Sequence, residues 1–210
     1  AVHSMKDLPL RLPKGLCVAA VTEREDARDA LVSRSGRSFA ELPAGSRVGT
    51  SSLRRRSQLL FARRDLEMMD IRGNVDTRLR KLDEGRYDAV VLAACGLIRL
   101  GLEERITEYL PFEHMLPEPG QGALGIEARG ADADTLEIVQ QLNDPTARAC
   151  VETERAFLGA LGGGCRVPIA AYASYLKGAL ALEGAVIAED GRAQVRGALE
   201  GPMTEPVSLG

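Results

Sequence analysis

The fold is decided by residues 46–85, SRVGTSSLRRRSQLLFARRDLEMMDIRGNVDTRLRKLDEG. A short apolar strand ends at Gly49, and the serines after it predict the start of a helix. The next strand, within LEMMDIRG, is followed by Asn74 as a helix N-cap, and Gly85 predicts where that second helix ends. Strands that alternate with helices at this spacing predict parallel βαβ units, and therefore an α/β layer fold.

The flanking segments extend this pattern. Residues 15–22, GLCVAAVT, predict a buried strand, and Asp26 predicts the N-cap of a short helix that runs through Leu31. Residues 87–101, YDAVVLAACGLIRLG, predict a strand followed by a helix. Residues 111–122, PFEHMLPEPGQG, are rich in Pro and Gly and predict a crossover between two lobes.

The C-terminal part of the chain follows a different pattern. Residues 123–129 predict a strand and 132–143 a helix, and Pro145 suits the first turn of a further helix that runs to Leu161. Residues 179–201 alternate between apolar and polar around an Asp-Gly turn, which is typical of antiparallel strands. We therefore expect a small α+β domain at this end of the chain.

The composition is that of an ordinary soluble globular protein, because 45% of the 210 residues are hydrophobic and 27% are charged. The longest nearly apolar run, 89–98, is too short to span a bilayer, so we expect no membrane partner. Four scattered cysteines without a C-x-x-C pair, and only two histidines, argue against a metal site and against a disulfide framework. This cysteine usage favours a reducing, cytoplasmic compartment.

The net charge of −3 hides a local basic field. Between Arg47 and Lys81, ten basic residues outnumber four acidic ones, so this window carries +6 in a chain of net charge −3. A basic field in an otherwise acidic protein indicates a bound anion, whereas a nucleic-acid-binding domain is usually basic throughout. We therefore expect an anionic small molecule as ligand and no nucleic acid.

Two strand-to-helix junctions supply groups that bind an anion. In VGTSSLRRR the free N–H groups of a helix N-terminus lie beside Arg54 and Arg55, and in IRGNVDTR the residues Arg72 and Arg78 flank the second junction. Parallel strands would bring both junctions to the same edge of the sheet, where α/β folds bind ligands. No phosphate-binding sequence G-x-x-x-x-G-K-[ST] occurs, so a nucleotide is not favoured.

Two further residues have unusual surroundings. Asp7 ends the run HSMKD, residues 3–7, and beside a basic ligand site it could be the carboxylate that faces a developing positive charge. Cys165 lies in LGALGGGCRVPIA, residues 158–170, where three glycines offer no packing to a buried thiol. A surface turn and a loop cysteine without a function also explain these residues, so the residues alone leave both alternatives open.

Six stretches together resemble one family. VHSMKDLP, GTSSLRR, RGNVDTRLRKL, LAACGLIRLG, LPEPGQGALGIE and ERAFLGALGGGCRVPIA occur in this order between Val2 and Ala170, and they closely resemble the porphobilinogen deaminases, also called hydroxymethylbilane synthases. The resemblance implies two α/β lobes like those of periplasmic binding proteins plus a small α+β domain. Here it implies a partial domain 1 from residues 1–22 and 123–140, domain 2 from 28–116, and domain 3 from 145–210.

The resemblance also implies the chemistry. Members of the family carry a dipyrromethane cofactor on a cysteine through a thioether, which is Cys165 here, and Asp7 matches their essential aspartate. They join four porphobilinogen molecules head to tail into hydroxymethylbilane, with release of ammonia, in haem biosynthesis. The residues implied to bind the cofactor are Cys165, Asp7, Lys6, Ser52, Arg54, Arg55 and Arg78, and those implied to bind substrate are Ser4, Thr50, Arg72, Arg99 and Gln121. The implied enzyme is a cytoplasmic monomer without a metal.

The family's chains begin before AVHSMKD and continue past PMTEPVSLG, so the resemblance implies a fragment that lacks the start of domain 1 and the extreme C-terminus. The alternative function is a non-catalytic anion-binding module of the periplasmic-binding-protein type. This alternative explains the two basic junctions and the crossover. It assigns no role to Cys165 or Asp7, which favours the enzyme.

Overall fold

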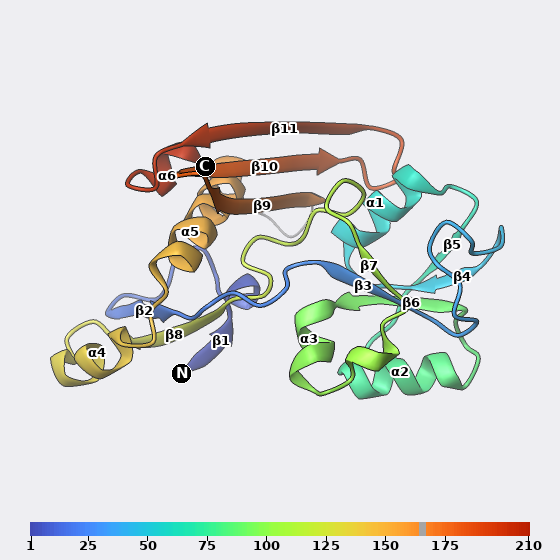
Figure 1. Cartoon of the computed structure of the whole chain (residues 1–210), viewed down its shortest axis with the longest axis horizontal. Coiled ribbons are helices and arrows are strands. Elements are labelled where there is room, and N and C mark those ends of the chain that lie inside the picture. The colour runs from blue at the N-terminus through green and yellow to red at the C-terminus, as the bar shows by residue number, and fades with distance from the viewer. Residues whose placement is uncertain (164–166) are drawn as a thin grey trace.

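The computed structural model describes residues 1–163 and 167–210 and arranges them around three sheets (Figure 1). One sheet has five strands in the order β5-β4-β6-β3-β7, and two antiparallel sheets have three strands each, in the orders β1-β8-β2 and β11-β10-β9. The fold is therefore mixed α/β with a small α+β unit formed by the C-terminal part of the chain, as the sequence predicts.

Helices cover both faces of the five-stranded sheet (Figure 1). Alternate residues of a strand point to opposite faces, so Ala30 and Val32 pack with α2 and α3, whereas Leu31 packs with α1. Burial on both faces explains why the central strands are continuous apolar runs. The elements are β3 (Asp29–Ser33), β4 (Arg47–Gly49), α1 (Leu53–Ala62), β5 (Glu67–Met69), α2 (Val75–Asp83), β6 (Ala89–Ala93), α3 (Ala94–Arg99), the 3-10 turn Glu103–Arg105 and β7 (Glu108–Leu110).

The helices after β4 and β5 begin where the sequence predicts. The Ser52 hydroxyl accepts a hydrogen bond from the Arg55 N–H at 3.4 Å, and the Asn74 side chain accepts one from the Thr77 N–H at 2.9 Å. Each side chain thereby satisfies one of the free N–H groups at its helix N-terminus. Gly85 follows α2 with φ +77°, a backbone conformation that glycine adopts without strain. The predicted caps and the predicted stop are confirmed.

Two predictions about the segment after Asp26 and about the sheet are wrong. The residues through Leu31 belong to strand β3 rather than to a helix, and Asp26 pairs with Arg28 instead of capping one. β3 is antiparallel to β6 and β7, whereas β4 is parallel to β5 and β6, so the sheet is mixed rather than all-parallel. The run DALVS is short and forms its backbone hydrogen bonds with the strands on either side, a tertiary effect that local propensity does not reveal.

A second sheet lies at the opposite end of the long axis from α2 (Figure 1). It contains β1 (Val2–Ser4), β2 (Leu16–Val21) and β8 (Leu124–Arg129), and α4 (Ala133–Gln140) packs against it. Two segments, 22–28 and 111–123, connect this sheet to the five-stranded sheet. The second segment contains the predicted crossover.

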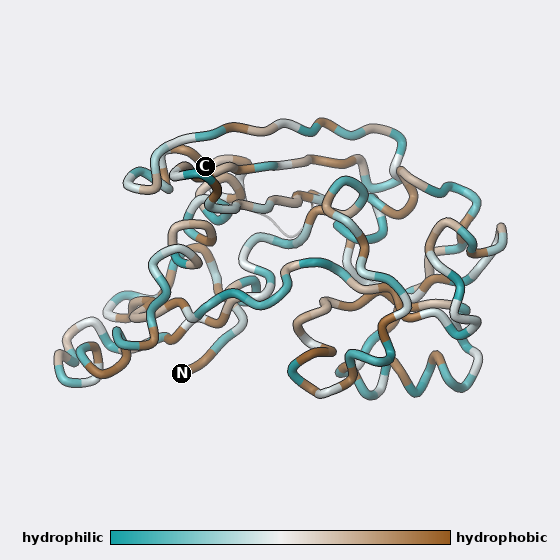
Figure 2. The backbone as a smooth tube through the Cα atoms, in the orientation of Figure 1, coloured by the Kyte–Doolittle hydropathy of each residue, from teal (hydrophilic) through white to brown (hydrophobic). Residues whose placement is uncertain are grey.

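The third sheet packs against α5 (Pro145–Ala160). Asp144 caps α5 by accepting a hydrogen bond from the Ala147 N–H at 2.6 Å, and Pro145 occupies its first turn as predicted. The strands are β9 (Ile169–Leu176), β10 (Ala179–Ile187) and β11 (Gln194–Gly201), followed by α6 (Pro206–Leu209). The predicted antiparallel pair β10–β11 is confirmed. Figure 2 shows hydrophobic and hydrophilic residues alternating along β11.

Candidate active site

The carboxyl ends of the parallel strands β4 and β5 meet at one edge of the sheet, where α1 and α2 begin. Ser51 joins the two junctions, because its hydroxyl donates to Ile71 O at 2.8 Å and accepts from Ile71 N at 3.0 Å. Thr50 is buried, and its hydroxyl accepts a hydrogen bond from Ser52 N at 3.3 Å. The prediction that both junctions share an edge is confirmed.

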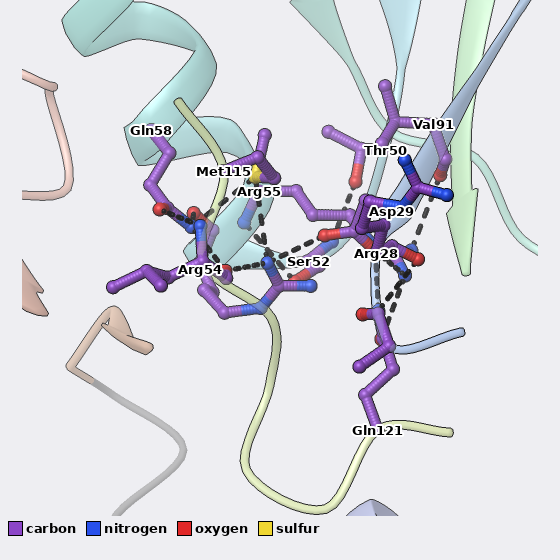
Figure 3. Close-up of polar contacts among 12 residues, drawn as sticks. Arg28, Asp29, Thr50, Ser52, Arg54, Arg55, Gln58, Val91, Met115 and Gln121 are labelled. Carbon is purple, nitrogen blue, oxygen red and sulfur yellow. Dashed lines mark hydrogen bonds and ion pairs between the residues drawn. The ribbon is translucent and has the colours of Figure 1, made fainter. Parts of the chain in front are cut away.

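A buried carboxylate, Asp29, lies at this edge (Figure 3). Because β3 is antiparallel to β6, the first residue of β3 lies opposite Ala93, the last residue of β6. Asp29 is 0% exposed and accepts hydrogen bonds from Arg54 Nη1 at 2.8 Å, Arg55 Nε at 3.0 Å and Gln121 Nε2 at 2.9 Å. Burial by itself would raise the pKa of this carboxyl, but Arg54 and Arg55 outweigh burial and hold the pKa well below its usual range.

The two arginines use their donors differently. Arg55 directs Nε and Nη2 to Asp29 and Nη1 to Val91 O at 3.3 Å. Arg54 uses Nη1 alone, which donates to Asp29 and, at 2.6 Å, to Leu116 O. Among the described residues, Nε and Nη2 of Arg54 are buried and have no hydrogen-bond partner. Buried donors without a partner are costly, so the Nε–Nη2 edge of Arg54 is the unsatisfied part of this cluster among the described residues.

Gln121 connects this cluster to the segments between the sheets. Its Nε2 donates to Ala27 O at 2.8 Å as well as to Asp29, and its Oε1 accepts from Lys6 Nζ and Arg55 Nη2, each at 3.4 Å. The side chain is 0% exposed, and both ends of the amide contact the protein. Gln121 was expected to bind substrate; in this structure it holds Lys6 and Arg55.

A cleft of about 520 Å³ opens beside the cluster, a volume typical of small-molecule sites. The fold brings four predicted residues to its wall from two distant segments: Lys6, Asp7, Ser52 and Arg54. Burial lowers the pKa of the Lys6 ammonium, and the positive charge of Arg55 lowers it further. The remaining lining residues are Leu8, Pro9, Leu10, Ser51, Leu53, Glu118, Pro119, Leu158, Gly163, Val167 and Ile169.

The loop that carries Asp7 is held by α5. Asp7 is exposed at the end of the 3-10 turn Met5–Asp7. The guanidinium of Arg155 donates to the carbonyl oxygens of Met5 at 3.1 Å, Leu8 at 2.9 Å and Pro9 at 2.6 Å. These carbonyls lie on both sides of Asp7 in the chain, so a single side chain from α5 fixes the backbone around the acid.

Cys165 lies outside the described residues. Gly163 and Val167, the nearest described residues on either side of it, both line the cleft. Of the other cysteines, Cys95 and Cys150 are buried and Cys17 is half-buried.

The other predicted residues are not among those that line the cleft. Arg78 is half-buried, and burial together with the charge of Arg55 lowers the pKa of its guanidinium, so the two arginines lie within electrostatic range. Arg99 donates from Nη2 to the backbone carbonyl of Gly122 at 2.8 Å, on the segment that precedes β8. Arg72 is exposed at the second junction, and Ser4 ends β1.

Sequence reasoning missed Asp29 and Arg155. The signal for Asp29 was present, since this charged residue precedes four apolar or small residues, but the segment through Leu31 was interpreted as a helix. Arg155 carries no local signal, because its partners are backbone carbonyls more than a hundred residues away in the chain.

Comparison with known sequences identifies the family. Residues 1–137 match the sequence profile described as "Porphobilinogen deaminase, dipyromethane cofactor binding domain", and residues 148–210 match "Porphobilinogen deaminase, C-terminal domain". The chain belongs to the porphobilinogen deaminase family. These are enzymes of tetrapyrrole biosynthesis, so the alternative of a non-catalytic anion-binding module is set aside.

Curated porphobilinogen deaminases match along almost the whole chain. The protein from Roseiflexus castenholzii is 54% identical over 100% of this chain and 69% of its own length. That from Pelobacter propionicus is 54% identical over 100% and 67%, and that from Chlorobaculum tepidum is 49% identical over 98% and 66%. The chain thus spans about two thirds of the length of these relatives.

Two solved structures that match part of the chain have low TM-scores and low sequence identity. A putative amino acid ABC transporter domain from Streptococcus pneumoniae has a TM-score of 0.37 at 17% identity, covering 68% of this chain and 60% of that one. A periplasmic binding protein from Brucella ovis has a TM-score of 0.39 at 18% identity, covering 71% and 44%.

The cleft has the properties that the family's dipyrromethane cofactor requires. A dipyrromethane bears acetate and propionate groups, and the Nε–Nη2 edge of Arg54 matches a carboxylate in geometry and charge. Lys6 adds a second cation to the same wall, and the wall includes Gly163 and Val167, which lie two residues from Cys165 in the sequence. The residues present therefore fit the group.

Within residues 1–163 and 167–210, no three His, Cys, Asp or Glu side chains are grouped so that they could hold a metal ion. In the same part of the chain no helix combines the length and apolar character needed to cross a membrane.

Proposed function

We propose that Cys165 anchors the dipyrromethane of this porphobilinogen deaminase through a thioether and that Asp7 is the catalytic acid–base residue beside it. In this proposal the enzyme joins four porphobilinogen molecules head to tail, with loss of ammonia at each addition, and water releases the product as hydroxymethylbilane. The observation that carries the proposal is the cleft itself, where Asp7, Lys6 and Arg54 share a wall with Gly163 and Val167.

When bound, the dipyrromethane would supply the free pyrrole carbon to which the first unit is added, and each later unit would add to the end of the growing chain. A thiolate is the appropriate nucleophile for attaching such a group, and the glycines beside Cys165 leave room for two rings. Asp7 is exposed and lines the cleft, and within residues 1–163 and 167–210 its carboxylate has no ion-pair partner. In this proposal it stabilises the positive charge that develops on porphobilinogen as ammonia leaves, and accepts the proton lost after coupling.

The cationic side chains of the site are proposed to bind the carboxylates of the pyrrole rings. Every pyrrole ring brings an acetate and a propionate, so the growing chain accumulates negative charge. We propose that Arg54, Lys6, Arg55, Arg78 and Ser52 bind the cofactor carboxylates, and that Arg72, Arg99, Thr50, Ser4 and Gln121 line the path of the substrate. Arg54 has the strongest support, because among the described residues two of its buried nitrogens have no hydrogen-bond partner, whereas every side-chain nitrogen of Arg55 has one.

We also propose the domain division 1–22 with 123–140, 28–116, and 145–210. Each part contributes its own sheet, which supports this division. The enzyme is proposed to act as a cytoplasmic monomer on porphobilinogen, without nucleic acid or membrane partners; light scattering of the purified enzyme tests the monomer.

Intact-protein mass spectrometry tests the anchor. The purified enzyme is expected to carry a mass increment of two pyrrole units, which Cys165→Ser removes and the matched control Cys150→Ser, a buried thiol elsewhere, retains. An increment that survives Cys165→Ser would contradict the proposal, and so would an unmodified mass in active wild-type enzyme.

Steady-state kinetics test the acid. Asp7→Asn is expected to keep the increment and to lower kcat by about 10²–10⁴-fold with little change in KM, because the variant keeps the shape of the site but loses the charge and the base. A near-normal kcat would exclude this role for Asp7.

A further inference from the structure

Asp29 is the most completely coordinated side chain at the edge of the sheet, yet nothing in the proposed mechanism uses it. Its Oδ1 accepts hydrogen bonds from Arg55 Nε at 3.0 Å and Gln121 Nε2 at 2.9 Å and forms an ion pair with Arg55 Nη2 at 2.8 Å. Its Oδ2 accepts a hydrogen bond from Arg54 Nη1 at 2.8 Å. All three partners are buried. The carboxylate therefore fixes the orientation of two guanidinium groups at once.

Arg54 and Arg55 differ in how many of their guanidinium nitrogens have hydrogen-bond partners. Arg55 is held on every nitrogen, by Asp29, Gln121 and the Val91 carbonyl. Arg54 is held only at Nη1, by Asp29 and the Leu116 carbonyl, and Figure 3 shows its guanidinium reaching back to Asp29 from the first turn of α1. Within residues 1–163 and 167–210, Nε and Nη2 of Arg54 have no hydrogen-bond partner, and these two nitrogens form the edge that binds a carboxylate in bidentate fashion.

We propose that Asp29 is a positioning residue for carboxylate recognition, which anchors Nη1 of Arg54 so that the Nε–Nη2 edge is fixed toward the cleft before a pyrrole carboxylate arrives. This inference rests on the proposed function, because the carboxylates are those of the primer and of porphobilinogen. A side chain that is already held loses little rotational freedom on binding, so the anchor favours tight and oriented binding.

The unpartnered edge distinguishes this role from one in folding alone. A cluster that served only stability would be expected to pair both buried donors of Arg54, since an unmade buried hydrogen bond opposes folding. The cleft wall carries two positive charges, Arg54 and Lys6, and two negative charges, Asp7 and Glu118, so hydrogen bonding rather than net charge favours a ligand. A carboxylate ligand would supply the acceptors that Nε and Nη2 of Arg54 lack among the described residues.

A double-mutant cycle tests the inference in the enzyme, with Asp29→Asn, Arg54→Gln and the two combined. The readouts are the fraction of molecules that carry the primer by intact mass, and KM and kcat for porphobilinogen on the loaded fraction. Asp29→Asn and Arg54→Gln are each expected to reduce primer loading or to raise KM by about tenfold or more. In the combined variant, the second substitution is expected to change primer loading or KM by less than about threefold beyond the first, because Asp29 acts through Arg54.

The matched control is Asp26→Asn, which removes the same charge from the same segment but only breaks a partly exposed pair with Arg28. It is expected to retain primer loading and KM. A folded Asp29→Asn enzyme with normal loading and normal KM overturns the inference, and so do effects that multiply in the combined variant. A loss of kcat alone, at constant KM and loading, also overturns it, because that is the result of a smaller folded fraction.

Asp29→Asn leaves two buried guanidinium groups without a counter-charge, which destabilises the fold. A second pair of variants therefore tests the inference if Asp29→Asn does not fold. Arg55→Gln and the charge-balanced pair Asp29→Asn with Arg55→Gln both retain Arg54, but only the first retains its anchor. The pair is expected to bind primer and substrate about tenfold or more weakly than Arg55→Gln alone. Equal binding overturns the inference, and so does failure of the balanced pair to fold, which would assign Asp29 to folding. Wild-type enzyme without primer or turnover would instead contradict the proposed function.

Discussion

Glu154→Gln is the most informative test of how the three sheets are joined. Glu154, in α5, is 0% exposed and pairs with both terminal nitrogens of Arg24, at 2.6 and 3.1 Å. The same carboxylate accepts hydrogen bonds from the backbone N–H groups of Gly120 at 2.7 Å and Ala173 at 2.8 Å. It thus links the segments 22–28 and 111–123 to α5 and β9.

The magnitude follows from what the substitution leaves behind. The glutamine keeps the size of the side chain but removes its charge, and its NH₂ group must face a donor, either Arg24 or one of the two backbone N–H groups. Removing one partner of a buried ion pair costs about 3–5 kcal/mol, because the other charge remains buried. For a chain of this size that corresponds to a fall in Tm of about 6–20 °C.

Thermal and urea unfolding, followed by circular dichroism, measure this loss. The matched control is Glu152→Gln, the same change two residues earlier in α5, where the partner is Arg148 at 3.3 Å and both side chains are partly exposed. We expect the control to lose less than about 1 kcal/mol. Equal losses in the two variants would refute the argument, because burial and not the chemical change is its basis.

Two further predictions concern the backbone and a thiol. Gly122→Ala should destabilise the protein by about 3 kcal/mol or more. Gly122 has φ +94°, which strains an alanine by about 1–3 kcal/mol, and a Cβ there would also lie 2.5 Å from Glu25 O on the neighbouring crossover. Gly101→Ala is the control, with φ +67° and open space, and an equal fall in Tm for both would show that the clash does not matter. Burial raises the pKa of the Cys150 thiol to about 11 from an ordinary value of 9.0, so the stability that this thiol contributes is present below pH 9 and is lost as the pH rises toward 11. At pH 8, iodoacetamide should therefore modify Cys150 only after denaturation, and alkylation as fast as that of half-buried Cys17 would contradict the prediction.

Local sequence signals predicted most of the elements correctly. Ser52, Asn74 and Asp144 cap α1, α2 and α5 because each cap depends only on a side chain and the N–H group three residues later. The motifs around Asp7 and Cys165 helped to identify the family from the sequence. These motifs are also local, because covalent and acid–base chemistry requires particular residue types in short, fixed surroundings.

The sequence by itself therefore determined where α1, α2 and α5 begin, the basic junctions and the family. Only the tertiary structure decided that β3 enters the sheet antiparallel, which brings Asp29 to the edge where Arg54 and Arg55 begin α1. It also decided which arginine keeps free donors and that Arg155 holds the loop of Asp7. The physical reason is that a strand's direction and a buried side chain's partners depend on segments far away in the chain, and no pattern within a single segment encodes them.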